Sequence, residues 1–270
     1  MMRRPASCWS GDTLSSPPSP PSPSSVAVLR RVYRRPSESH RMFLKRASSE
    51  YCIASVVRYH PHIVGALDLL MEDYHFCVVM ALTEMGNPLS RTSTPTMTLL
   101  TQLTDAIAYL HSLGIAHCNI QPNTILVFPC GTVKLTGFGD AHVFCPPFQT
   151  THIPLSTTKT VGLLAYQAPE VLGAWNHAHT NPLAATAAAA PVDVWALGIV
   201  VYAHAQEGRL PWSVACLRHD AQYAQFQTHP PPSSLLHHLL DPNPVTRINS
   251  QQLFTYLSSH HIPSLFSILD

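Results

Sequence analysis

Hydrophobic positions in the middle and second half of the chain follow helical spacings. Between Thr98 and His111 the apolar residues recur every three or four positions, which predicts an amphipathic helix, and Gly114 suits its C-terminal end. Residues 194–204 are apolar on nearly every face, which predicts a helix buried at the centre of a globular unit. These two segments are the helices that the pattern indicates most clearly.

The first part of the chain shows a different pattern. Residues 26–29 read Val-Ala-Val-Leu and favour a strand, and residues 74–82 read as a buried strand. Between them a polar, basic stretch precedes residues 50–57, which could be helical. An alanine-rich segment at 174–190 is expected to be a surface loop, with a short helix as the alternative.

Residues 1–25 have the composition of a tail. Five of its six prolines lie among serines, a composition that cannot bury apolar surface and favours extended conformations. We expect a disordered leader, with a ligand for a proline-binding domain as the alternative.

Composition excludes several classes of protein. The formal net charge of +1 does not indicate a nucleic-acid partner, and 46% hydrophobic residues are enough for one or two cores. The longest strongly apolar stretch, 194–203, is half of the roughly 20 residues that span a bilayer, so we expect no transmembrane segment. The start of the chain lacks the apolar region of a secretory signal, and a cytoplasmic location, with the nucleus as alternative, is expected.

Cysteine usage gives little support for a zinc ribbon or disulfides. The seven cysteines are scattered without a C-x-x-C pair, so we expect free, mostly buried thiols. The paired histidines lack cysteine or carboxylate companions in the sequence, and we expect them to be surface residues.

Five short motifs follow the first predicted helix in a fixed order. They are His-Cys-Asn-Ile-Gln-Pro-Asn-Thr-Ile-Leu at 117–126, Lys-Leu-Thr-Gly-Phe-Gly at 134–139, Ala-Pro-Glu at 168–170, Asp-Val-Trp at 193–195, and Arg247. Their order and spacing resemble the catalytic loop, D-F-G segment, A-P-E segment and large-lobe residues of protein kinases. Residues 27–36, 49–55, 60–64 and 210–212 further resemble the fungal halotolerance and nitrogen-permease-reactivator kinases.

The resemblance implies a fold class and a division of the chain. The fold would be α+β, a two-lobed protein-kinase-like fold with a truncated β-rich N-lobe and a mainly helical C-lobe. The N-lobe would occupy residues 26–82 and the C-lobe residues 83–265, after the tail at 1–25. The glycine-rich loop should precede residue 26, but the first 25 residues contain a single glycine, so we identify neither that loop nor the first two strands.

Most positions that handle nucleotide in the family are changed here. The family's catalytic base falls on Asn119, a neutral amide that cannot act as a base. The strand lysine that holds the phosphates falls on Leu29, so Glu50, at the position of the lysine's glutamate partner, is expected to have lost that partner. Gln121 replaces the catalytic-loop lysine and Thr124 the metal-binding asparagine.

The magnesium-binding aspartate of the D-F-G segment falls on Gly137, which removes a hard carboxylate ligand. Asp140 is the nearest acid, and three residues downstream it is expected to point elsewhere. The chain's three lysines, at positions 45, 134 and 159, all lie away from the first strands, so none is a substitute for the missing one. Seven of the sixteen cations fall within residues 30–46, and we expect a solvated linker there, with a phosphoprotein, nucleic-acid or lipid site as the alternative.

The architectural residues of the family are present. By resemblance, His117 and Phe138 would stack in a hydrophobic spine, and Asp193 would anchor the catalytic-loop backbone. Glu170 would pair with Arg247 inside the large lobe.

This contrast leads to one functional hypothesis and two alternatives. The hypothesis is a catalytically inactive pseudokinase that acts as a scaffold or regulatory binding module for an unidentified protein partner, without a cofactor. The first alternative is an atypical active Ser/Thr kinase of the fungal transporter-regulating family, which would use ATP and Mg²⁺. The second is a decayed kinase paralogue without a function.

Overall fold

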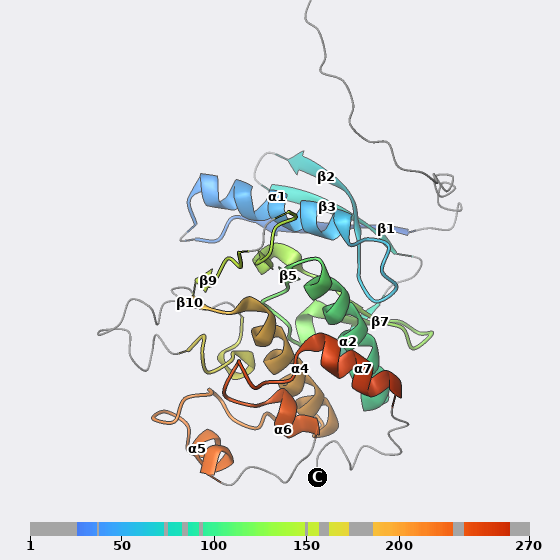
Figure 1. The fold of residues 1–270 in the computed structure, drawn as a ribbon. Helices are drawn as coiled ribbons and strands as arrows, with labels where there is room; N and C mark the ends of the chain where they lie inside the picture. The colour runs from blue at the N-terminus through green and yellow to red at the C-terminus, as the bar shows by residue number, and fades with distance from the viewer. Residues whose placement is uncertain are drawn as a thin grey trace, which may run out of the picture.

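The computed structural model describes residues 26–36, 38–72, 75–82, 86–91, 94–148, 151–156, 162–172, 186–228 and 235–259. Within these ranges the chain forms a small, β-rich lobe and a larger, mainly helical lobe (Figure 1). The expected tail at 1–25 lies outside them.

The small lobe contains three strands and one helix. They are β1 (Val26–Tyr33), α1 (His40–Val56), β2 (Ala66–Glu72) and β3 (His75–Leu82). The strands form an antiparallel sheet in the order β1-β3-β2, with Leu29 opposite Val79 and Glu72 opposite His75. Among the described strands β1 therefore has a neighbour on one side only, which leaves an open sheet edge.

Helix α1 begins ten residues before the predicted segment at 50–57. The Ser39 hydroxyl accepts a hydrogen bond from the Met42 amide at 3.3 Å and caps its start. The buried side chains recur every three or four positions and so form one face, which consists of Phe43, Ala47, Glu50, Ile53 and Ala54. This face packs against the sheet, where Phe43 and Phe76 rings lie 5.3 Å apart.

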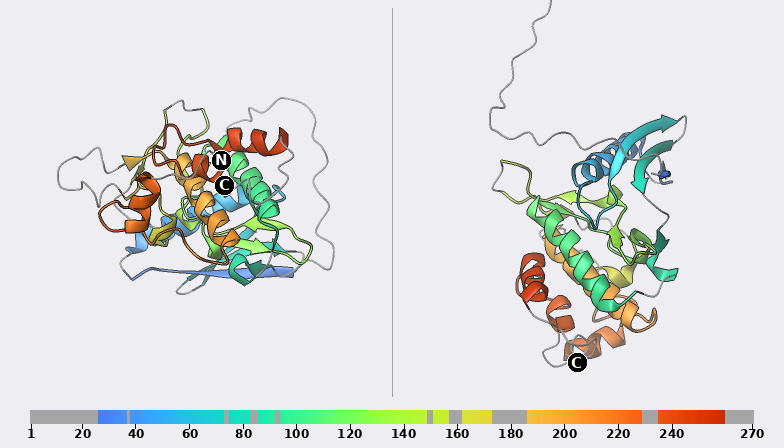
Figure 2. Two further views of the ribbon diagram at one scale, coloured as in Figure 1. Left: turned by 90° about the horizontal axis from the view of Figure 1, so that it is seen from below. Right: turned by 90° about the vertical axis from the view of Figure 1, so that its right-hand side faces the viewer.

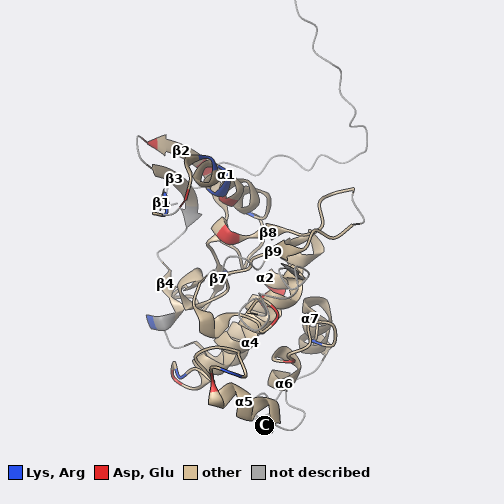
Figure 3. Ribbon diagram, turned by 90° about the vertical axis from the view of Figure 1, so that its left-hand side faces the viewer, with Lys and Arg blue, Asp and Glu red and all other residues tan. Residues whose placement is uncertain are grey.

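The prediction that residues 30–46 form a solvated basic linker is wrong for most of that range. Arg30 and Arg31 lie in β1, and Arg41, Lys45 and Arg46 lie in the first turns of α1. Figure 3 shows these cations gathered on the small lobe. The sequence prediction failed because the apolar positions of β1 and α1 are interrupted by arginines whose long side chains extend past the core.

The large lobe is arranged around one buried helix (Figure 2). Its helices are α2 (Thr96–Ser112), α4 (Ala189–Ala205), α5 (Ala221–Thr228), α6 (Leu235–Leu239) and α7 (Ser250–Ser259). Most of α4 is buried, and the ring centroid of the fully buried Trp195 lies 5.7 Å from that of Trp212. The helices predicted at 98–111 and 194–204 are thus confirmed, each with extra residues at its start.

Short strands and single 3₁₀ turns occur in the segments that connect the longer elements. The strands are β4 (Asn87–Pro88), β5 (Ile115–Ala116), β6 (Ile125–Val127), β7 (Val133–Leu135), β8 (His142–Val143), β9 (Leu155–Ser156) and β10 (Thr186–Ala187). The 3₁₀ turns are η1 (Leu89–Arg91), η2 (Pro122–Thr124), η3 (Phe138–Asp140) and η4 (Leu164–Tyr166).

The loop expected at 174–190 is only partly within the described residues. Residues 186–187 pair with β9 and Ala189 already belongs to α4, so the end of that segment is ordered structure rather than a loop. No helix in the described ranges has the length and apolar character needed to cross a membrane. None of the six described cysteines forms a disulfide, and two of them, Cys77 and Cys216, are buried.

Candidate functional site

The loop after β5 is anchored by one buried carboxylate. Asp193, on α4, is fully buried and accepts hydrogen bonds from the backbone amides of His117 and Cys118, each at 2.7 Å. Cys118 has a φ of 60°, in the left-handed region that non-glycine residues rarely adopt. The two charge-assisted bonds hold this strained backbone in place, as the resemblance implies for Asp193.

The same loop packs on the Phe138 turn. The rings of His117 and Phe138 lie 5.2 Å apart and meet edge to face. A His117 ring nitrogen, Nε2, lies 3.0 Å from the Thr136 carbonyl oxygen. Burial lowers the pKa of His117, so the imidazole is neutral and donates this bond.

Glu170 and Arg247 form a two-pronged ion pair inside the large lobe. The Arg247 Nη1 and Nη2 atoms donate to the two Glu170 carboxylate oxygens at 2.7 and 2.9 Å. Arg247 also donates to the carbonyl oxygens of Asp241 and Pro191, and its guanidinium lies 5.0 Å from the Trp195 ring centroid. This buried arginine therefore has a partner for its charge and for most of its N–H groups.

Asn119, at the catalytic-base position, is bound to an acid from the Phe138 turn. Its amide donates to Asp140 Oδ2 at 3.1 Å, and the Arg35 guanidinium donates to both Asp140 oxygens at 2.9 and 3.1 Å. The expectation that Asp140 points elsewhere is wrong. The η3 turn after Gly137 folds back and presents the Asp140 carboxylate to the loop.

The Thr124 hydroxyl is bonded within its own loop, whereas the Gln121 side-chain oxygen has no partner there. The Thr124 hydroxyl lies 3.0 Å from the carbonyl oxygens of Asn119 and Gln121 and accepts from the Gln121 amide at 3.2 Å. The Gln121 side-chain oxygen is buried and makes no hydrogen bond. Neither side chain therefore offers a charged group to a nucleotide.

Gly137 adopts a left-handed conformation with a φ of 89°. A Cβ added there would lie 3.2 Å from Thr124 Cγ2 and 3.8 Å from Arg30 Nη1. The residues at the family's magnesium positions are thus a glycine and a threonine whose hydroxyl is bonded within its loop. They do not fit a hard divalent cation, which needs carboxylate or carbonyl oxygens directed at it.

The prediction that Glu50 lost its partner is wrong. Glu50 is buried on α1, and its Oε1 forms an ion pair and a hydrogen bond with the Arg30 guanidinium. Leu29 is 49% exposed, because successive side chains of a strand point to opposite faces and Arg30 takes the face toward α1. A search for another lysine could not find this cation, because the partner of Glu50 is an arginine, one position after Leu29.

Burial leaves Glu50 incompletely stabilised. Its Oε2 atom is buried without a hydrogen bond, and a Cβ added to Gly139 would lie 2.7 Å from that atom. Burial raises the pKa of Glu50, while the nearby Arg30 and Arg46 oppose the rise. The close packing of Gly139 thus joins α1 to the η3 turn.

A second ion pair orders the segment between β1 and α1. Arg46 Nε and Nη2 donate to the two Glu38 oxygens, each at 2.8 Å, and Nη2 also donates to the Tyr33 carbonyl oxygen at 2.8 Å. The hydrogen bond from Arg46 is the main cause that lowers the pKa of Glu38 to about 2. Together with Arg35 on Asp140, these contacts form a network of arginine–carboxylate pairs on the side of the small lobe that packs against η3, here called the cleft side.

The chemistry of this arrangement follows from its partners. A pocket of about 60 Å³, room for a few water molecules, is lined by Asn119, Asp140 and Tyr166, among others. Asn119 cannot accept a proton, and Asp140 is neutralised by Arg35. Among the described residues, Asp140 contacts both Asn119 of the large lobe and Arg35 of the small lobe, and so helps to hold the two lobes together.

Comparison with known proteins places the chain in a family. Residues 24–257 match the protein kinase domain. The chain is 28% identical to the serine/threonine-protein kinase hal4 of Schizosaccharomyces pombe, over 84% of this chain and 37% of that protein. It is 30% identical to the nitrogen permease reactivator protein of Saccharomyces cerevisiae, over 68% of this chain and 22% of that protein.

A third relative, the serine/threonine-protein kinase HAL4/SAT4 of Saccharomyces cerevisiae, is 29% identical over 84% of this chain and 39% of its own length. The chain thus spans between about a fifth and two fifths of the length of these curated relatives. The match over residues 24–257 covers most of the sequence, and the chain belongs to the protein kinase domain family.

Proposed function

We propose that this chain is a catalytically inactive pseudokinase domain that acts as a scaffold or regulatory binding module for a protein partner. One observation carries the proposal. At the positions where the family holds phosphates, metal and the substrate hydroxyl, this chain has Leu29, Gly137 and Asn119, and the nearby charged groups are paired with one another.

The physical reason lies in how phosphoryl transfer is catalysed. The reaction depends on positioned charges: a cation on the phosphates, a metal held by carboxylates, and an acceptor for the hydroxyl proton. Arg30 is neutralised by Glu50 and Asp140 by Arg35. Freeing Arg30 for a ligand would leave the buried Glu50 carboxylate without its counter-charge.

The first experiment measures phosphotransfer. The unaltered chain is incubated with labelled ATP and Mg²⁺, alone and with a generic protein substrate, beside a matched Leu29→Ala, Asn119→Ala double variant. We expect the same background labelling from both. Labelling of the unaltered chain above the double variant would contradict the proposal.

The second experiment measures thermal unfolding of the purified chain alone, with ATP, and with ATP plus Mg²⁺. A ligand that binds only the folded state raises stability by RT ln(1 + [L]/Kd). We expect one cooperative transition that neither addition moves. A shift that requires Mg²⁺ would indicate a metal site in the cleft and would return the active-kinase alternative.

One contact favours that alternative, an active Ser/Thr kinase using ATP and Mg²⁺. The Arg30 guanidinium lies near Gly137, where a cation could meet phosphate oxygens. In that case an Arg30→Ala variant would lose both the ATP-dependent shift and the labelling. If neither signal exists in the unaltered chain, Arg30 is only the partner of Glu50.

The third reading, a decayed paralogue, predicts poor soluble expression and a broad melt. The complete Glu170–Arg247 and Asp193 contacts favour a maintained fold instead. The fungal relatives suggest regulation of nutrient or ion transport in the cytoplasm as the setting. Pull-down from a fungal extract with the chain, compared with its Arg247→Ala variant, would identify partners that need the folded domain.

A further inference from the structure

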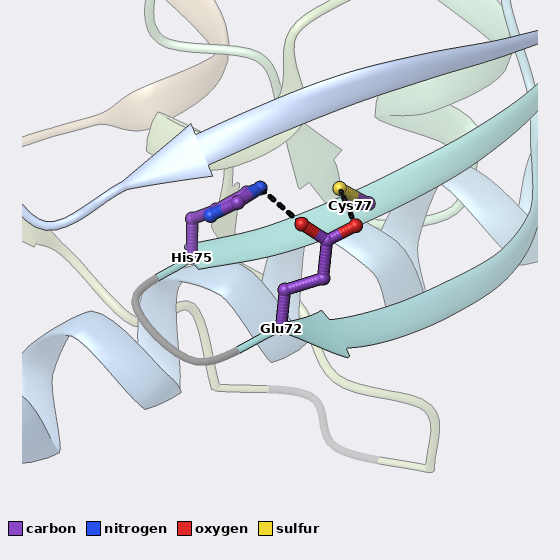
Figure 4. Close-up of side chains that lie close together, drawn as sticks. All are labelled: Glu72, His75 and Cys77. Carbon is purple, nitrogen blue, oxygen red and sulfur yellow. Dashed lines mark hydrogen bonds and ion pairs between the residues drawn. The ribbon is translucent and has the colours of Figure 1, made fainter.

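Three side chains with different metal-binding atoms meet at the end of the small-lobe hairpin (Figure 4). Glu72 is the last residue of β2, and His75 and Cys77 lie on β3. Residues two apart on a strand share a face, so His75 and Cys77 point the same way. Glu72 pairs with His75 across the strands, which brings its carboxylate between the other two side chains.

The distances suit a single small ion. Glu72 Oε2 lies 2.8 Å from His75 Nε2, and Glu72 Oε1 lies 3.4 Å from Cys77 Sγ. One ligand atom from each residue lies within 4.8 Å of the other two. Tetrahedral zinc bonds of roughly 2.0–2.3 Å place ligand atoms roughly 3.3–3.8 Å from one another, so small side-chain rotations complete the geometry.

The surroundings also suit a metal. Cys77 is fully buried, and His75 Nε2 is buried without a hydrogen bond of good geometry, despite its proximity to Glu72. The His75 ring is held by stacking on Tyr33, with ring centroids 5.0 Å apart. The Glu72 side chain is 48% exposed and gives an ion a path from solvent.

The groups around the Cys77 thiol act on it in opposite directions. Burial, with the neighbouring Glu72 carboxylate, raises the pKa of the Cys77 thiol, while Arg31 opposes the rise. Arg31 lies directly opposite Cys77 in the sheet.

We propose that Glu72, His75 and Cys77 form a zinc site with a water molecule as its fourth ligand. A thiolate, an imidazole and a carboxylate are a ligand set that zinc accepts. The ion would fasten the end of the β2–β3 hairpin in a lobe whose described sheet has only three strands. The site does not depend on the proposed pseudokinase function, because it lies on the sheet rather than at the kinase-family positions.

The test uses Co²⁺ as a spectroscopic probe, followed by Zn²⁺ competition, on the reduced full chain in a non-chelating buffer. Cobalt bound by a thiolate gives a sulfur-to-metal charge-transfer band. We expect this band in the unaltered chain, its loss on addition of one equivalent of Zn²⁺, and a higher melting temperature with Zn²⁺ than with a chelator.

Two variants and one control decide the assignment. Glu72→Gln changes a half-exposed residue without altering its size, so it keeps the fold, and we expect binding at least about tenfold weaker. Cys77→Ser should abolish the charge-transfer band. Cys52→Ser, which removes an exposed thiol of α1, should bind as the unaltered chain does.

A different set of results would overturn the proposal. If the unaltered chain shows no charge-transfer band and no zinc-dependent shift, the three side chains are only a hydrogen-bonded hairpin end. If Glu72→Gln and the Cys52→Ser control bind with equal affinity, Glu72 is not a ligand and the site as proposed does not exist.

Discussion

The interior of the large lobe and the cleft side of the small lobe both contain buried or mostly buried carboxylates bound by cationic or amide groups. In the large lobe, Asp193 and Glu170 meet the partners that the kinase family implies. On the cleft side, Glu50 and Asp140 meet arginines that the resemblance does not imply. The large lobe thus has the pairs that the family resemblance implies. On the cleft side the carboxylates are also paired with charge, but by different residues.

The difference shows which constraint acts on each region. A buried carboxylate must be paired whether or not the protein catalyses anything, because an unpaired charge is costly in the interior. Phosphate and metal binding instead need charged groups that are free to meet a ligand. On the cleft side, Arg30 and Arg35 pair with the carboxylates. The same pairing leaves these charged groups without the freedom to meet a phosphate or a metal.

The largest expected effect is in the large lobe. Arg247→Ala should lower the free energy of unfolding by about 3–5 kcal/mol, since it strands Glu170 in the interior. Urea denaturation measures the change, and Arg218→Ala, at an exposed arginine of the same lobe, is the control. Equal midpoints for the two variants would contradict the importance of the pair.

The cleft pair should contribute less. Arg30→Ala should lower the free energy of unfolding by about 1–2 kcal/mol, because the arginine is partly exposed although Glu50 is buried. The double variant Arg30→Ala, Glu50→Gln should recover most of this loss, since a neutral amide needs no counter-charge. If the double variant is no more stable than Arg30→Ala alone, charge pairing is not the reason for the contact.

A pH effect distinguishes the outer ion pair from the inner one. The pKa of Glu38 is about 2 in the folded chain against an ordinary value of 4.5, so its contribution is present above 4.5 and is lost as the pH falls toward 2. After allowance for solvent screening, Glu38→Gln should cost about 1 kcal/mol at pH 7.

Urea titrations of Glu38→Gln and the unaltered chain at pH 7, 5 and 3 measure this prediction. The stability difference should be similar at pH 7 and 5 and smaller at pH 3. A difference that grows as the pH falls would show that the Arg46 contact does not lower the pKa of Glu38.

The smallest effect is expected at the position of the missing lysine. Leu29→Lys should change the free energy of unfolding by less than about 0.5 kcal/mol and should create no ATP-dependent thermal shift, because this side chain faces away from Glu50. Leu70→Lys, at another exposed leucine of the same sheet, is the control. A shift with ATP in Leu29→Lys alone would show that residue 29 reaches the cleft.

Several features of the site could be predicted from the chain alone. The helices around Leu103 and Leu197 follow from apolar spacing, and the order of the motifs containing His117, Gly137 and Glu170 indicates the kinase domain. That Asn119 and Gly137 have no ionisable side chain is a matter of residue identity and needs no coordinates.

Other features depend on distances between residues far apart in the chain. The Arg30–Glu50 and Arg35–Asp140 pairs join positions 20 and 105 residues apart, and a one-residue change of strand phase decides whether residue 29 or 30 faces α1. Such pairings depend on how β1, α1 and the η3 turn pack, and no local pattern encodes them.

Motif order was enough to indicate the kinase family, and residue identity was enough to predict that Asn119 and Gly137 replace reacting groups of that family, because both are properties of the chain. Only the tertiary structure decided which charges pair in the cleft and that Glu72, His75 and Cys77 meet at one hairpin end. The physical reason is that charge pairing and metal binding depend on separations of a few ångströms, which are set by packing between elements.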